Sequence, residues 1–261
     1  MKSKGFTLVE LIMTLTITGI VGVFVFQLFK AVTQESTKQD HISTLQRNLL
    51  QVRTALEKQL RMAGMNLENH APVVIREGAS VADSLTVLSI QPSQSAVLEM
   101  NENADAVVKV KNGNISPGGK LYLKDNGGSE CHPVLSVVDL GANVLEVTLS
   151  TPLSKNFNKD STTVRFVDSY SYFIDSTYPA RPKLVRLKNS QLSTVAEGVS
   201  DLQVTYFDGS DNVTAIDSLV QKIQFTFKVE GKLTGELAAP FNATGNRSRE
   251  NTVTVALRNR I

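Results

Sequence analysis

The chain has 261 residues, of which 41% are hydrophobic and 20% charged, so it is long enough for one or two domains and too apolar to be disordered throughout. Its 27 basic and 25 acidic residues nearly balance, which gives no electrostatic indication of nucleic-acid binding. A single cysteine, Cys131, excludes an intrachain disulfide and any structural zinc site built from several cysteines.

The first part of the chain predicts a membrane-spanning helix. Leu11 to Phe29 is a run of 19 residues without a charged side chain, and a helix of that length reaches roughly 28 Å, close to the ~30 Å hydrocarbon core of a bilayer. Lys2 and Lys4 precede the run, and no acidic residue comes before Glu10. This excess of positive charge predicts that the amino terminus stays in the cytoplasm and that the long remainder lies across the membrane.

Glu10 helps to distinguish a cleaved secretory signal, an uncleaved anchor and other kinds of membrane segment. A cleaved secretory signal has a shorter apolar region followed by a small-residue cleavage site, and the segment Gln27–Ser36 offers no such site. An uncleaved anchor fits the length, but a carboxylate at membrane depth costs about 2.5–3.5 kcal/mol on insertion scales. Because such a group is more often functional than accidental, Glu10 is a candidate functional residue.

The segment Lys4–Glu10, KGFTLVE, followed by an apolar helix resembles the class III signal of type IV pilins and type II secretion pseudopilins. The resemblance implies that prepilin peptidase cleaves after Gly5 on the cytoplasmic side, and that the same enzyme N-methylates the new amino terminus, Phe6. Glu10 then becomes the fifth residue of the mature chain (10 − 5 = 5). The family keeps a glutamate there, and its implied role is a contact between subunits during filament assembly.

Residues 1–5 are therefore expected to form a leader peptide, residues 6–29 a transmembrane and assembly helix, and residues 30–64 an amphipathic continuation of that helix. Gly64 is the expected stop, and no proline interrupts the stretch, so one helix is predicted over Phe6–Ala63. Apolar residues in the continuation recur three or four positions apart, which is the spacing of one helix face. We expect this stripe to pack on a core; it consists of Ile42, Leu45, Leu49, Val52, Leu56, Leu60 and Ala63.

The remainder, residues 65–261, is predicted to be a β-rich periplasmic head domain. Short runs with strand composition alternate with turn signals, and several show the apolar–polar alternation of strands with one buried face. With the amphipathic helix as cover, the pattern predicts an α+β fold with an antiparallel sheet, and the size of the region predicts an inserted subdomain around residues 91–160. The predicted strands are Ser84–Ile90, Ala106–Lys111, Lys120–Lys124, Pro133–Asp139, Val144–Leu149, Thr162–Val167, Ser171–Asp175, Lys183–Leu187, Leu202–Phe207, Ile223–Val229 and Thr252–Leu257.

Three downstream segments resemble PilW-type minor pilins more specifically: the end of the helix, one strand and the carboxy terminus. J-type pseudopilins of type II secretion systems share much of this pattern with less inserted β-structure. The three segments are Gln59–Gly64, Glu197–Tyr206 and Val255–Asn259.

The resemblance implies a minor pilin that is stored in the inner membrane by a single pass and is incorporated into, or primes, a type IV pilus through its N-terminal helix. The implied partners are other major and minor pilins, prepilin peptidase and the inner-membrane assembly platform, and the implied roles are cell adhesion and motility. A minor pseudopilin of a type II secretion system is the alternative, and an uncleaved membrane-anchored periplasmic protein is a more remote one. No enzyme activity, cofactor, metal or nucleic acid is expected.

Three local patterns suggest other chemistry, and each has a simpler interpretation. Cys131 and His132 are adjacent and would point to opposite faces of a strand, so a lone thiol beside turn residues is expected rather than a nucleophile–base pair. The Gly-rich segment Gly113–Lys120 lacks the spacing and the following helix of a phosphate-binding loop. Asp208–Asn212 has carboxylates suited to calcium but not the spacing of an EF-hand; a solvated turn is expected, and calcium binding stays open.

Overall fold

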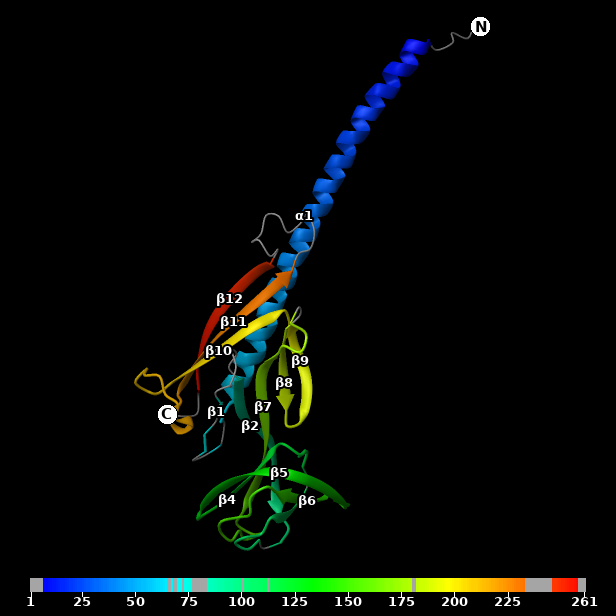
Figure 1. The fold of residues 1–261 in the computed structure, drawn as a ribbon. Helices are drawn as coiled ribbons and strands as arrows, with labels where there is room; N and C mark the ends of the chain where they lie inside the picture. The colour runs from blue at the N-terminus through cyan, green and yellow to red at the C-terminus, as the bar shows by residue number, and fades with distance from the viewer. Residues whose placement is uncertain are drawn as a thin grey trace. The chain divides into compact units, whose positions relative to one another are not determined.

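The computed structural model describes residues 7–64, 67, 70–71, 73–76, 84–99, 101–111, 113–179, 182–232 and 246–257. The chain divides into two compact units, one of residues 1–47 with 231–247 and the other of residues 48–230 with 248–261. One long helix is followed by antiparallel β-structure (Figure 1). This arrangement confirms the α+β fold class predicted from the sequence.

A single helix, α1 (Leu8–Met62), runs through 55 residues, which is roughly 83 Å at the standard rise. Its end is set by Gly64, whose φ of 67° lies in the left-handed region that favours glycine. The Gly64 N–H donates a 3.1 Å hydrogen bond to the Leu88 carbonyl, so the chain leaves the helix directly onto a strand. The predicted single helix over Phe6–Ala63 is confirmed, apart from Phe6, which lies outside the described residues.

The apolar stripe of α1 is buried over the last third of the helix. The last four of the predicted stripe residues have no exposed surface, and Leu45 is 3% exposed. Leu50, which lies off the stripe, is 62% exposed. The helix face that the spacing predicts to be buried is therefore the buried one; the four residues without exposed surface are Val52, Leu56, Leu60 and Ala63.

The larger sheet has nine strands, in the order β1-β2-β3-β6-β5-β4-β7-β8-β9 with an additional pairing between β2 and β7. The first half of β2 pairs with the second half of β7, from Leu85 opposite Tyr172 to Ile90 opposite Val167. The strands are β1 (Val73–Arg76), β2 (Ser84–Val97), β3 (Val107–Lys111), β4 (Lys120–Asp125), β5 (Gly128–Gly141), β6 (Val144–Leu149), β7 (Thr163–Asp175), β8 (Lys183–Lys188) and β9 (Gln191–Glu197).

The other halves of β2 and β7 belong to a closed six-stranded barrel. Their pairing continues past an irregularity to Ala96 opposite Thr163, and the ring β2-β3-β6-β5-β4-β7 closes on itself. Figure 1 shows β4, β5 and β6 grouped together, apart from β8 and β9. Every strand of the ring contributes to an interior made of Val97, Val108, Val110, Leu121, Leu123, Val134, Val147, Leu149, Leu153, Phe157, Val164 and Phe166.

The barrel is the inserted subdomain that the length of the head predicts. Its pairings run from Gln94 in β2 to Val167 in β7, close to the predicted range of 91–160. Since the barrel has its own apolar core while sharing two long strands with the open sheet, it is joined to the rest of the head through continuous β-structure instead of a linker.

A second sheet of three strands follows, in the order β10-β11-β12. It consists of β10 (Val199–Phe207), β11 (Lys222–Lys232) and β12 (Asn246–Ala256), with a single 3-10 turn, η1 (Asp217–Leu219), between the first two. The alternation predicted over Ile223–Val229 is confirmed, because Ile223, Phe225, Phe227 and Val229 have no exposed surface. The rings of Phe225 and Phe227 stack with their centroids 6.0 Å apart.

The structure differs from the predicted strands in a few places. The predicted strands Thr162–Val167 and Ser171–Asp175 are one strand, β7, because the intervening residues continue the ladder to β2. The sequence pattern does not predict β1 or β9: β1 has only four residues, and β9 is mostly polar. The other nine predicted strands are present, but three of them are longer than predicted: β2 continues to Val97, β5 begins at Gly128 and β12 begins at Asn246.

Candidate functional site

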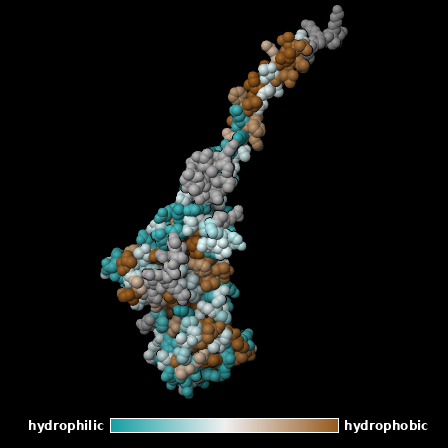
Figure 2. All heavy atoms as spheres, in the orientation of Figure 1, coloured by the Kyte–Doolittle hydropathy of each residue, from teal (hydrophilic) through white to brown (hydrophobic). Residues whose placement is uncertain are grey.

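The N-terminal half of α1 presents an apolar surface on which none of the described chain packs. The large apolar side chains from Leu8 to Val32 are each between 53% and 75% exposed, and Figure 2 shows them as brown spheres along the helix. Two threonine hydroxyls in this stretch are satisfied within the helix: Thr14 donates to the Glu10 carbonyl and Thr16 to the Ile12 carbonyl, at 2.9 and 2.8 Å. The helix is long and apolar enough to cross a membrane.

Glu10 caps the start of this helix together with Thr7. One carboxylate oxygen of Glu10 accepts hydrogen bonds from the Thr7 backbone N–H and the Thr7 hydroxyl, each 2.9 Å long. The Glu10 N–H donates in return to the Thr7 hydroxyl oxygen at 3.3 Å. This reciprocal arrangement is a capping box, which satisfies orphan donors of the first turn. Within one chain the carboxylate is thus hydrogen-bonded, but its charge has no cationic partner among the described residues.

The other predicted site residues lie beyond the described part of the chain. Gly5 and Phe6, the predicted cleavage and methylation positions, are outside it.

Within the apolar helix, Gly19 and Gly22 have no atoms within 4 Å of where a side chain would begin. Small residues in a membrane helix allow another helix to approach closely, so this face is open to a neighbouring helix.

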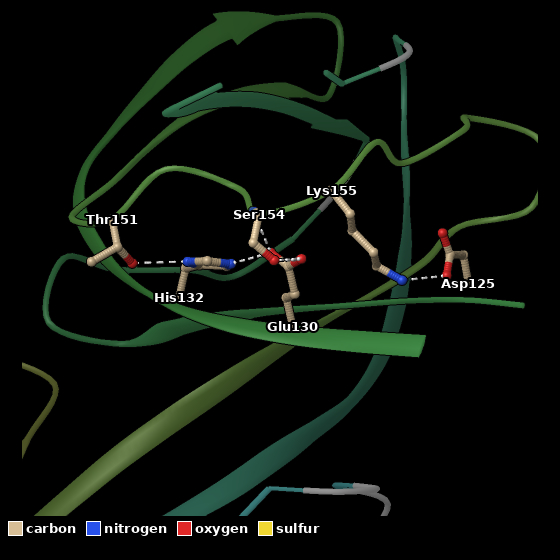
Figure 3. Close-up of polar contacts among 6 residues, drawn as sticks. All are labelled: Asp125, Glu130, His132, Thr151, Ser154 and Lys155. Atoms are coloured by element: carbon tan, nitrogen blue, oxygen red, sulfur yellow. Dashed lines mark hydrogen bonds and ion pairs between the residues drawn. The ribbon is translucent and has the colours of Figure 1, made fainter. Parts of the chain in front are cut away.

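A polar cluster on the barrel is not predicted by the sequence pattern. Glu130 and His132, two residues apart in β5, point toward the β6–β7 connection (Figure 3). His132 Nε2 lies 2.7 Å from Glu130 Oε2, and His132 Nδ1 lies 2.9 Å from the Thr151 hydroxyl. Ser154 donates to the same carboxylate from its backbone N–H at 3.0 Å and from its hydroxyl at 2.5 Å. The signal in the sequence is only the i, i+2 spacing of Glu130 and His132, which puts them on one face of a strand.

The cluster holds the β6–β7 connection against the barrel. An ionised carboxylate only accepts, so His132 Nε2 is the donor to Glu130, while Nδ1 is hydrogen-bonded to the Thr151 hydroxyl. A neighbouring ion pair joins Lys155 and Asp125 at 2.6 Å, and the Lys155 ammonium lies 4.6 Å from the centre of the Phe157 ring. Because this connection supplies Leu153 and Phe157 to the barrel interior, we interpret the cluster as structural.

Replacing Glu130 by glutamine is expected to lower stability by about 1–3 kcal/mol at pH 7. Burial alone would raise the pKa of Glu130, but hydrogen bonds from Ser154 and His132 outweigh it and hold the pKa below its usual 4.5. A carboxyl with a lowered folded-state pKa contributes stability above its unfolded value and loses it as the pH falls. The difference between wild type and Glu130→Gln should therefore shrink in urea unfolding curves below about pH 4.5. A difference that stays constant to pH 3 would contradict this assignment.

Cys131 and His132 do point to opposite faces of β5, as predicted, but the expected turn environment of the thiol is wrong. Cys131 lies inside the strand and packs against an apolar cluster that includes Tyr122 and Val167. Burial raises the pKa of its thiol to about 11, which suppresses the reactive thiolate at neutral pH. Cys131 is therefore an inert packing residue of the head.

The two loop patterns have the simpler structures that the sequence favours. Gly113–Lys120 leads into β4, not into a helix, and turns at Gly118, whose φ is 83°. The Asp208 carboxylate accepts hydrogen bonds from the backbone N–H groups of Ser210 and Asn212 at 2.8 and 2.9 Å, as in a closed turn. Within the described ranges, no group of three or more His, Cys, Asp or Glu side chains is placed to hold a metal ion.

Comparison with known proteins finds a family match at the amino terminus. Residues 1–26 match the family model described as the prokaryotic N-terminal methylation motif. No curated protein matches the chain as a relative. Among solved structures, phage phi92 endosialidase aligns with 68% of this chain at 11% identity and a TM-score of 0.21, a similarity too low to indicate a shared fold. This chain spans about a third of that protein, 33% of its length.

The methylation motif covers the predicted cleavage junction, Glu10 and most of the exposed apolar helix, and it is absent from the β-rich head. Its match supports the part of the resemblance that rests on Lys4–Glu10, and it leaves the three downstream segments untested. The chain thus carries, at residues 1–26, the N-terminal methylation signal of type IV pilins and pseudopilins, followed by an α+β structure consistent with the pilin fold.

Proposed function

We propose that this protein is a minor pilin of a type IV pilus. The observation that carries the proposal is the continuity of the methylation motif with a 55-residue helix whose first half is apolar and exposed and whose apolar stripe is buried over the last third. A helix of this kind is stored in the inner membrane by its first half, with the head on the periplasmic side, and packs against the helices of other pilins when it enters a filament.

The proposed partners are the proteins that process the subunit, extract it from the membrane and receive it in the filament. Prepilin peptidase removes residues 1–5 and methylates Phe6, the inner-membrane assembly platform extracts the subunit, and major and minor pilins receive it. In the pilus the head is displayed at the cell surface, where it contributes to adhesion and motility. The closed barrel supports a PilW-type subunit over a J-type pseudopilin, because J-type pseudopilins share the pattern of segments with less inserted β-structure.

Deleting the gene is expected to reduce sheared surface filaments by roughly tenfold or more and to leave secretion of exoproteins unchanged. The reason is that a minor pilin primes or completes the filament, so a sub-stoichiometric subunit limits its assembly. Filament yield and exoprotein activity are measured on the same cultures, with the wild-type gene restored as the control. Normal filaments combined with lost secretion would contradict the proposal and favour the pseudopilin alternative.

A further inference from the structure

One edge of β5 is left without a neighbouring strand. The first part of β5, Gly128–Pro133, pairs with β4, and the second part, Val134–Gly141, pairs with β6 on the other side. From Leu135 to Gly141 no described strand lies on the β4 side. The backbone N–H and C=O groups that alternate along this edge are available to an added strand.

The side chains along this edge are apolar and exposed. Leu135, Val138 and Leu140 are 60%, 49% and 51% exposed. The register to β6 slips between Val134 and Ser136 and again between Asp139 and Gly141. Each slip is a bulge, in which two residues oppose one. The first bulge turns Leu135 outward, onto the face that already carries Val138 and Leu140, whereas Val134 faces the barrel interior at 3% exposure.

Two outer edges of the described sheets, those of β9 and β12, are protected in ways that this one is not. The β9 edge presents one exposed large apolar residue, Leu192, and ends in Glu197. The β12 edge carries Arg249 and Glu250, both exposed, and charges of this kind discourage strand addition. On the β5 edge the one charged residue is Asp139, whose carboxylate accepts a hydrogen bond from the Gly141 N–H at 2.8 Å.

The edge is complementary to a second copy of itself. When two β5 strands lie antiparallel about a two-fold axis with Val138 opposite Val138, Ser136 faces Leu140 and Val137 faces Asp139. In this register outward side chains meet outward ones and inward meet inward, and Asp139 does not oppose its own copy. An isologous contact needs such self-complementarity, and like charges directly opposite each other would destabilise it.

We propose that the β5 edge, Leu135–Leu140, is a self-association site at which a second copy of this chain adds its own β5 antiparallel, so that two inserted barrels form one continuous sheet. Strand addition of this type uses backbone hydrogen bonds for attachment and side chains for register. The bulges confine the regular pairing to about five residues on each strand, so the contact is a weak and reversible one between separate subunits. The proposal does not depend on whether the chain serves a pilus or a secretion system.

The two-fold axis through Val138 provides the test. The full chain is prepared in detergent micelles with Cys131→Ala, so that a single new cysteine is the only thiol. Val138→Cys then places two sulfurs across the axis, where directly opposed strand residues lie within disulfide range. Under mild oxidation we expect a covalent dimer to form roughly tenfold faster or more than with the control Leu192→Cys, which is more exposed than Val138 but lies on β9.

The control separates this contact from association through the apolar helix, because helix contacts would raise both rates alike. Adding Leu140→Lys to the Val138→Cys chain should slow cross-linking by about tenfold. The substitution replaces an apolar side chain by a charge opposite Ser136 at both ends of the pairing, and a lysine on an edge strand discourages strand addition. Equal rates for the cysteines at positions 138 and 192, or no effect of Leu140→Lys, would overturn the proposal.

Discussion

Replacing Glu10 by valine is expected to leave the protein inserted, processed and folded, and to lower its recovery in sheared filaments by roughly tenfold or more. The capping box with Thr7 hydrogen-bonds the carboxylate, and no cationic group among the described residues neutralises its charge. A carboxylate at membrane depth costs about 2.5–3.5 kcal/mol. In the proposed function, a methylated amine of a neighbouring subunit about 4 Å from this carboxylate would contribute roughly 4 kcal/mol at an effective dielectric constant near 20. Recovery is measured as the amount in the filament fraction divided by the membrane pool.

Two further substitutions separate the charge of Glu10 from its hydrogen bonds. Glutamine retains the capping role, because it serves in capping boxes as glutamate does, but it carries no charge. If pairing with the amine is the role of Glu10, Glu10→Gln should fail as Glu10→Val does, while Glu10→Asp, shorter by one methylene, should be intermediate. Wild-type recovery for Glu10→Gln would show that only the cap matters, and wild-type recovery for Glu10→Val would remove the assembly role altogether.

Replacing Leu56 by aspartate is expected to destabilise the head by about 4 kcal/mol or more. Leu56 has no exposed surface, so the substitution leaves a cavity and puts an unpaired carboxylate in an apolar core. Leu50→Asp is the matched control, because Leu50 is in the same helix and 62% exposed; it should cost about 1 kcal/mol or less, mostly from helix propensity. The measurement is the free energy of unfolding from denaturant curves. These are followed by far-UV circular dichroism, because the chain has no tryptophan for fluorescence.

Similar losses for the two aspartate variants would contradict the packing of α1. A large loss at Leu50 would mean that the exposed face of the helix also packs in solution, and a small loss at Leu56 would mean that the stripe is not in the core.

The sequence predicts most of what depends on local patterning. The stripe from Leu45 to Ala63 and the alternation in Ile223–Val229 repeat at the helix and strand periods, and burial follows them. The Thr7–Glu10 cap is local as well, with the T-x-x-E spacing of a capping box, but it is not among the features predicted above. In contrast, β9 is polar because its side chains are largely solvent-exposed, so periodicity gives no sign of it.

Features that depend on distant pairings are not predictable from one segment at a time. The barrel closes through residues of β2 and β7 that are about seventy positions apart, such as Ser95 opposite Val164, and no local signal specifies that contact. The environment of Cys131 follows from the same topology, because the cluster around it is drawn from several strands. The unpaired edge of β5 likewise appears only once the partners of both its halves are known.

The mature amino terminus tests the central claim most directly. The protein is purified from membranes of a strain with an intact prepilin peptidase, and its intact mass and N-terminal peptide are determined. We expect a chain that lacks residues 1–5 and begins with Phe6 carrying one methyl group on its amine, and we expect Gly5→Arg to retain the leader because a bulky cation obstructs the cleavage junction. A wild-type chain that still begins at Met1, with no methyl group on Phe6, would contradict the pilin account and leave an uncleaved membrane anchor in its place.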